Sequence, residues 1–167
     1  EGLHVTSLLG GTLHFLVAPL VPANAKPTFG PSVGLLHFAP AGREGLRYLE
    51  GRGLTRDTMT RFRLGFSPAG RSSLKEHLAS AGFTGEEMNL AGVLVHGDDI
   101  PVSYDRFRNR VIFPITDPKE RVVAFGGRAL EKDAKPKYLN SPETPLFHKG
   151  NLLFNSAKAR TPAYERA

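Results

Sequence analysis

The stretch "RVIFPITDPKERVVAFGG", residues 110–127, decides the fold class of this chain. It contains two short runs of β-branched and aromatic residues, "RVIFPI" and "RVVAFGG", separated by the turn residues of "TDPKE". Runs of this kind are typical of strands, and the connector favours a hairpin. We therefore expect two paired strands here.

Helical patterns lie before this hairpin. "REGLRYLEGRGL" places Leu46 and Leu49 on one helical face and ends in glycines. Thr55 is a suitable N-cap for a helix through "RDTMTRFR" that ends at Gly65. Ser72 or Ser73 could cap a helix through "LKEHLASAG".

A further capping signal and a later helix complete the pattern. Thr84 and Glu87 form a capping box for a helix through "GEEMNLAG". After the hairpin, "NLLFNSAKAR" predicts another helix. Helices followed by a small sheet indicate an α+β fold, with short helices packed on a small mixed or antiparallel sheet.

The composition supports a packed domain and excludes several kinds of site. Of 167 residues, 40% are hydrophobic and 23% are charged, which is enough for a core. The chain has no cysteine, so disulfides and cysteine-ligated metals are excluded. No apolar run is long enough to cross a bilayer, so we expect no membrane partner.

The charge is distributed unevenly. Residues 1–42 contain Glu1 and Lys26 as their only charged side chains, whereas residues 43–167 hold the whole net charge of +6. We expect residues 1–42 to be a poorly ordered extension that is not necessarily native to the domain. An export signal is the alternative for "LHFLVAPLV", although no basic residue precedes it.

Three arginines alternate in "YDRFRNR": Arg106, Arg108 and Arg110. On an extended segment this spacing places all three on one face, where they could follow a phosphate backbone. A solvated edge strand protected by charge is the alternative. In "AFGGR", two glycines allow a close backbone approach before Arg128. The alternative interpretation of the same residues is a β-bulge followed by a surface arginine.

"PKYLNSPET", residues 136–144, suits neither a regular helix nor a regular strand. Lys137 is a cation, Tyr138 a stacking face and Asn140 a hydrogen-bonding amide, and prolines on both sides stiffen them. We expect this loop to contact a nucleotide or a single strand, with a plain surface connection as the alternative. Lys149 adds a cation further along.

No catalytic constellation is visible in the sequence. His96 and His148 have no partner at metal-ligand spacing, and Asp98 and Asp99 are expected to be turn residues. We therefore predict no catalytic and no metal-binding residues here.

Four segments together resemble one known family: "RGLTRDTMTRFRLGFSP", "YDRFRNRVIFPI", "VVAFGGRAL" and "PKYLNSPETPLFHKGNLLFN". They look like the N-terminal subdomain of the RNA-polymerase core of bacterial DnaG-type DNA primase, and they cover roughly residues 43–160. The family is a nucleotidyltransferase that makes short RNA primers on single-stranded DNA for replication.

The resemblance implies roles for particular residues. Arg106, Arg108 and Arg110 match positions that hold the template strand. The positions that line the groove toward the incoming nucleotide and template match Arg128, Lys137, Tyr138 and Asn140, and further basic positions match Arg52 and Lys149.

The resemblance also implies partners, cofactors and a location. These are single-stranded DNA, ribonucleotides and a replicative helicase bound through a C-terminal domain, in the cytoplasm at the nucleoid or replisome. The family holds Mg²⁺ or Mn²⁺ in a TOPRIM domain and Zn²⁺ in an N-terminal ribbon.

The chain departs from the family pattern at both ends. It has no cysteine for the ribbon, and residues 161–167 look like a truncated link toward the missing TOPRIM domain. We therefore expect an inactive fragment that binds no cofactor by itself. The alternatives are a stand-alone single-stranded nucleic-acid-binding module without polymerase activity, or a basic protein with a chance likeness.

Overall fold

The computed structural model describes residues 42–165 except residue 81. The expected extension, residues 1–42, therefore lies outside the described residues apart from Gly42, where the first helix begins. The elements in chain order are α1 Gly42–Gly51, α2 Arg56–Arg61, β1 Gly65–Ser67, α3 Ser73–Ser80, α4 Gly85–Leu90, β2 Leu94–Val95, β3 Tyr104–Asp105, β4 Arg110–Thr116, β5 Val122–Ala129, β6 Tyr138–Asn140, the 3₁₀ helix η1 Lys149–Asn151 and α5 Ser156–Glu165.

The expected hairpin is confirmed as β4 and β5, which pair antiparallel from Arg110–Ala129 to Thr116–Val122. They form the centre of a four-stranded sheet in the order β1-β4-β5-β6, in which every pair is antiparallel. A separate ribbon joins β2 to β3. The α+β class is confirmed, with an antiparallel rather than a mixed sheet.

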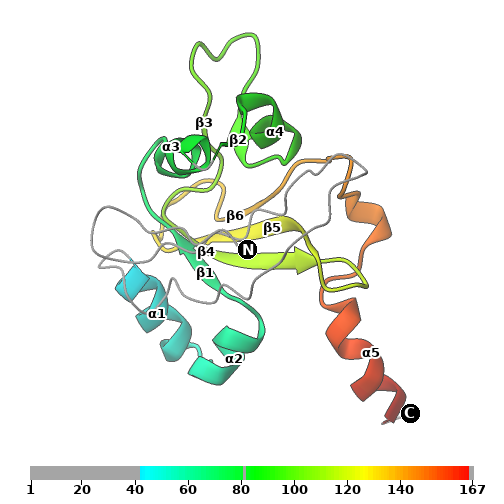
Figure 1. The fold of residues 1–167 in the computed structure, drawn as a ribbon. Coiled ribbons are helices and arrows are strands. Elements are labelled where there is room, and N and C mark those ends of the chain that lie inside the picture. Colours follow the sequence, from blue (N-terminus) through cyan, green and yellow to red (C-terminus); the bar gives the residue numbers. More distant parts are fainter. Residues whose placement is uncertain (1–41, 81, 166–167) are drawn as a thin grey trace.

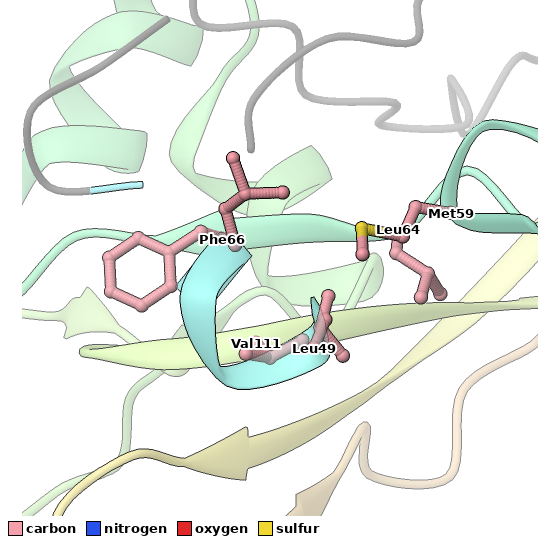
Figure 2. Close-up of a cluster of buried hydrophobic side chains, with 6 residues drawn as sticks. Leu49, Met59, Leu64, Phe66 and Val111 are labelled. Carbon is pink, nitrogen blue, oxygen red and sulfur yellow. The ribbon is translucent and has the colours of Figure 1, made fainter. Parts of the chain in front are cut away.

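One face of the sheet is covered by α1 and α2 (Figure 1). Val111 of β4 is completely buried there, against Leu49 of α1 and Met59 of α2 (Figure 2). Burial of large apolar side chains is the main stabilising contribution of such a cluster. The cluster contains Leu46, Leu49, Met59, Leu64, Phe66 and Val111.

The opposite face carries α3 and α4 (Figure 1). Their cluster contains Leu74, Leu78, Met88, Val93 and Leu94, and Phe125 of β5 packs against it. Phe107 continues this layer, with its ring in edge-to-face contact with Phe125 at 6.2 Å between centroids. The sheet is therefore covered by helices on both faces.

The helix ends confirm two capping predictions. The Thr55 side chain accepts a hydrogen bond from the Thr58 N–H at 3.2 Å, although α2 ends at Arg61 rather than continuing to Gly65. Thr84 and Glu87 form the full capping box.

The serine cap predicted for α3 is wrong. The carboxylate of Asp105, in β3, accepts from the N–H groups of Leu74 and Lys75 at 2.7 and 3.0 Å. Ser72 instead donates its hydroxyl to the side chain of Glu76. The first turn of α3 is therefore satisfied from a strand more than thirty residues away.

The final helix, α5, extends away from the sheet (Figure 1). It begins at Ser156 and is consistent with the helix expected in "NLLFNSAKAR", although it starts later. Within the described part of the chain, no helix combines the length and apolar character needed to span a bilayer.

Candidate nucleic-acid interface

A polar cavity of about 530 Å³ lies on the α3/α4 face of the sheet. We call it the arginine cavity, and its walls include Tyr104, Arg106, Arg108, Arg110, Glu131 and Leu139. The three arginines predicted to share a face do share this cavity. The extended geometry predicted for them is wrong, because 106–109 is irregular and Asn109 has a φ of 50°.

Arg110 is buried and its terminal nitrogens are engaged by the protein. They donate to the carbonyl oxygens of Pro136 at 2.7 Å and Lys137 at 3.2 Å. Burial, followed by the charge of Arg108, lowers the pKa of Arg110, but a guanidinium remains charged at neutral pH. Arg110 therefore holds the start of β6 in place.

Arg108 and Arg71 both lie against the ring of Tyr104, with their guanidinium carbons 4.7 and 4.4 Å from its centroid. Arg108 also donates to the Asp105 carbonyl at 2.8 Å. The aromatic ring orients two cations toward the same surface. Sequence reasoning missed Arg71 and Tyr104, since only the fold brings "AGRSS" beside "SYDRF".

Arg106 reaches from the arginine cavity to β6. Its Nε–H donates to the Asn140 carbonyl at 3.1 Å. Burial lowers the pKa of Arg106, and the nearby Tyr104 acts in the opposite direction. Among the described residues, no hydrogen bond engages the terminal nitrogens of Arg106, so they are available to an anion.

A second cavity, of about 510 Å³, lies on the α1/α2 face. We call it the aromatic cavity, and its walls include Tyr48, Arg52, Arg128, Tyr138, Asn140 and Phe154. The Arg128 guanidinium carbon lies 4.0 Å from the centroid of the Tyr48 ring, and one terminal nitrogen donates to the Ala129 carbonyl. Its Nε is buried and has no partner among the described residues.

Tyr138 and Asn140 enter the aromatic cavity from β6, so the prediction that residues 136–144 suit no strand is wrong for these positions. Tyr138 pairs with Arg128 and Asn140 with Gly126 across β5 and β6. Paired residues of an antiparallel sheet lie on the same face, which brings Arg128, Tyr138 and Asn140 together. Tyr138 keeps 71% of its surface exposed.

The two adjacent glycines of β5 both line the aromatic cavity, and Gly127 also lies close to the ring of Phe107. A Cβ on Gly127 would lie 2.8 Å from the Phe107 ring, so glycine is needed for that aromatic contact. A Cβ on Gly126 would lie 3.3 Å from the Asn140 side-chain oxygen, at the wall of the aromatic cavity. The expected close approach at these glycines is confirmed.

The segment after β6 is anchored by Ser141, which is fully buried. Its hydroxyl accepts from the Phe125 N–H at 3.0 Å, and its own N–H donates to the Phe125 carbonyl at 2.9 Å. Pro142 packs so tightly over Gly92 that a Cβ there would approach within 2.8 Å. Asn140 therefore precedes a rigid anchor.

Lys137 and Lys149 are exposed and line neither cavity. Lys137 is placed through its carbonyl, which accepts from Arg110 and from Ala129. Lys149 follows a turn in which its N–H donates to Glu143 at 3.2 Å.

The described residues contain no group of three or more His, Cys, Asp or Glu side chains that could hold a metal ion. Asp98 and Asp99 lie in a turn, as expected. The polar and aromatic side chains that line the two cavities are cationic, aromatic and amide groups, together with the Glu131 carboxylate in the arginine cavity. Such groups suit the binding of an anion or of a flat ring.

Sequence reasoning also missed Tyr48 and Phe154. Phe154 is an apolar side chain left 51% exposed at a cavity wall, and Tyr48 reads as one more residue of an amphipathic helix. Neither has a local signal of function, because both become wall residues only after α1 and the η1–α5 segment pack near β5.

The chain is similar to known proteins in sequence and in fold. The family model described as "DNA primase catalytic core, N-terminal domain" matches residues 35–160. The DNA primase of Pseudomonas aeruginosa is 50% identical over 146 residues, covering 81% of this chain and 22% of that protein. The chain thus spans about a fifth of the length of the curated relatives it matches.

Solved structures agree in fold. A DnaG primase catalytic domain bound to single-stranded DNA superimposes with a TM-score of 0.65 and 43% identity, covering 75% of this chain and 38% of that one. The RNA polymerase domain of Mycobacterium tuberculosis DnaG in complex with double-stranded DNA superimposes with a TM-score of 0.70 and 32% identity. This match covers 77% of this chain and 40% of that one. The resemblance noted in the sequence is confirmed: this chain belongs to the family of the DNA primase catalytic core, N-terminal domain.

Proposed function

We propose that this chain is the part of a replicative DNA primase that holds the template strand and the incoming ribonucleotide. The observation that carries the proposal is the pair of chemically different cavities on the two faces of one sheet. In this assignment the arginine cavity takes template phosphates and the aromatic cavity takes a nucleotide base.

The arginine cavity suits a phosphate backbone. Arg106 and Arg108 each use one nitrogen on a protein carbonyl, and a guanidinium has five N–H donors. The remaining donors can form bidentate bonds with phosphate oxygens. Arg71 adds a third guanidinium beside Tyr104, and the excess of positive charge favours a polyanion.

The aromatic cavity suits a nucleobase. Its walls combine rings with a few polar groups, which is the usual composition of a small-molecule site. Tyr138 is exposed enough to stack on a base, and Arg52, Arg128 and Asn140 can bind phosphate or base edges. Lys137 lies next to Tyr138 and could neutralise a phosphate at the rim.

In the whole protein, this binding would serve primer synthesis on single-stranded DNA, with ribonucleotides as substrates and a replicative helicase as partner, at the replisome. Divalent Mg²⁺ or Mn²⁺ for nucleotidyl transfer, and Zn²⁺ for a ribbon, would be held by residues other than those described, since these form no suitable ligand group. The described residues bind and orient the two reactants.

The proposal is tested by titrating a labelled oligothymidylate into the chain at several salt concentrations. Removing one phosphate contact in Arg108→Ala should lower the magnitude of the salt slope by about 0.7, the value for single strands. Arg61→Ala, at an exposed α2 position that lines neither cavity, is the matched charge control and should change the slope less.

The nucleotide half is tested with a fluorescent ATP analogue. Arg128→Ala should weaken its binding, whereas Arg108→Ala should affect it little. If Arg108→Ala and Arg71→Ala both remain folded and keep the wild-type salt slope, the arginine cavity does not bind the strand and the assignment is wrong.

A further inference from the structure

Strand β6 is a short edge strand that belongs to both cavities. It pairs with β5 through only three residue pairs. Its side chains Tyr138 and Asn140 line the aromatic cavity, whereas Leu139 lines the arginine cavity. The position of β6 therefore affects the shape of both.

Two arginines of the arginine cavity hold β6 by its backbone. Arg110 donates to the carbonyls of Pro136 and Lys137 at the start of the strand. Arg106 donates to the carbonyl of Asn140 at its end. Because the strand makes few ladder contacts of its own, these side-chain bonds contribute substantially to where Tyr138 and Asn140 lie.

Arg110 and Arg106 differ in whether their terminal nitrogens are free to bind a ligand. Arg110 is 8% exposed, and both of its terminal nitrogens are occupied by carbonyls, so it is a fixed support. Arg106 is half-buried, lines the arginine cavity and uses only Nε on Asn140, so its outer nitrogens make no hydrogen bond to the described residues. Arg106 is therefore the residue that can respond to an anion.

We propose that Arg106 is a positioning residue that couples the two cavities through β6, so that a strand in the arginine cavity tightens nucleotide binding in the aromatic cavity. A phosphate on the outer nitrogens of Arg106 fixes the guanidinium plane. The fixed plane keeps Nε–H directed at the Asn140 carbonyl and strengthens that bond by polarisation. Asn140 is then held in the aromatic cavity before the nucleotide arrives.

The coupling is reciprocal, because a nucleotide that fixes Asn140 also fixes the Arg106 guanidinium for the strand. It rests on the proposed assignment of the two cavities. It adds to that assignment the consequence that the nucleotide binds more weakly to the empty protein than to protein whose arginine cavity holds the strand.

The test measures the affinity of the chain for a fluorescent ATP analogue with and without saturating oligothymidylate. In the wild type, the oligonucleotide should tighten nucleotide binding by about fivefold or more, a typical coupling between sites. In Arg106→Lys the positive charge remains but the bidentate geometry is lost, so the oligonucleotide concentration is raised until it saturates the variant as it saturates the wild type. A compact ammonium cannot hold a phosphate and the Asn140 carbonyl as one rigid plane, so the coupling should fall close to onefold.

Arg61→Lys, at an exposed position outside both cavities, is the matched control and should keep the wild-type coupling. Thermal melts of both variants confirm folding. Wild-type chain that binds both probes independently overturns the coupling while leaving the two-cavity assignment intact, and undiminished coupling in Arg106→Lys overturns the role of Arg106. Wild-type chain that binds neither probe overturns the assignment and the coupling together.

Discussion

The arginine cavity and the aromatic cavity are similar in size but differ in what their walls offer. The first presents guanidinium groups held by backbone carbonyls and by the Tyr104 ring. The second presents rings from Tyr48, Tyr138 and Phe154 around two arginines. A polyanion is favoured by the first and a flat base by the second, although only the thickness of one sheet separates them.

Strand alternation produces this difference. Arg110 and Val111 are neighbours in β4, yet one faces the arginine cavity and the other the α1/α2 core. Arg128 of β5 pairs with Val111 and therefore lies on the same α1/α2 face of the sheet. A shift of one residue in register would exchange the two sets of side chains, so the side chains that each face presents depend on the pairing of β4 with β5.

The largest expected effect is a loss of folding stability, and it shows whether the two faces of the sheet unfold together as one unit. Phe107→Ala removes a ring that is 4% exposed and packs on Phe125 beneath the arginine cavity, and should lower the free energy of unfolding by about 3–5 kcal/mol. Urea denaturation monitored at both faces measures it. Leu49→Ala is the counterpart on the α1/α2 face.

If the two faces fold as one unit, the urea transitions reported by the probes on both faces should shift together in each variant. The m-value should remain that of the wild type. Hydrogen exchange that loses protection only in α3 and α4 of Phe107→Ala would show instead that the faces unfold separately.

The next effect separates the cavities by their ligands. Tyr138→Ala removes an exposed stacking ring from the aromatic cavity and should cost about 1–3 kcal/mol of nucleotide affinity if a base stacks on it. Tyr138→Phe retains the ring and should retain most of the affinity. Equal losses in the two variants would assign the effect to the hydroxyl and contradict stacking.

A third effect is the pH dependence of folding stability that Asp105 produces on the α3/α4 face. Burial raises the pKa of Asp105, against the backbone hydrogen bonds from Leu74 and Lys75 that lower it. An acid whose folded pKa is raised loses stabilising effect as the pH rises from its ordinary value through the folded value. Asp105→Asn lacks this titration and loses part of the α3 cap, at a cost of about 1 kcal/mol.

The difference in free energy of unfolding between wild type and Asp105→Asn should therefore decrease as the pH rises through that interval. Equilibrium denaturation across an acidic pH series measures the difference. A difference that increases with pH would mean that the hydrogen bonds outweigh burial and that the folded pKa is lowered.

The smallest effect lies away from both cavities. Thr84→Ala removes the side-chain half of the capping box of α4, while the backbone N–H of residue 84 can still donate to Glu87. The free energy of unfolding should fall by roughly 0.5–1 kcal/mol. Affinities for the oligonucleotide and for the nucleotide should not change. A loss of either affinity would show that α4 influences one of the two cavities, although the cap residues Thr84 and Glu87 line neither of them.

The elements with local causes could be predicted from the sequence. Thr55, Thr84 and Glu87 act within one turn, and the "TDPKE" turn joins strands that are adjacent in the chain. The α3 cap could not be predicted, because Asp105 is brought to Leu74 by β3. Likewise β6 was not expected as a strand, since three residues between prolines pair only because β5 is already in place.

The same division applies to the candidate site. The sequence by itself determined its chemistry: arginines at alternate positions, a tyrosine and an asparagine in a stiff segment, and the family to which these motifs belong. Only the tertiary structure decided that Arg106 and Arg128 lie on opposite faces and that Arg110 supports a backbone. It also decided that Arg71 stacks on Tyr104 and that Tyr48 lines the aromatic cavity. The physical reason is that side-chain chemistry is local, whereas the face on which a side chain lies is set by strand pairing between residues far apart in the chain.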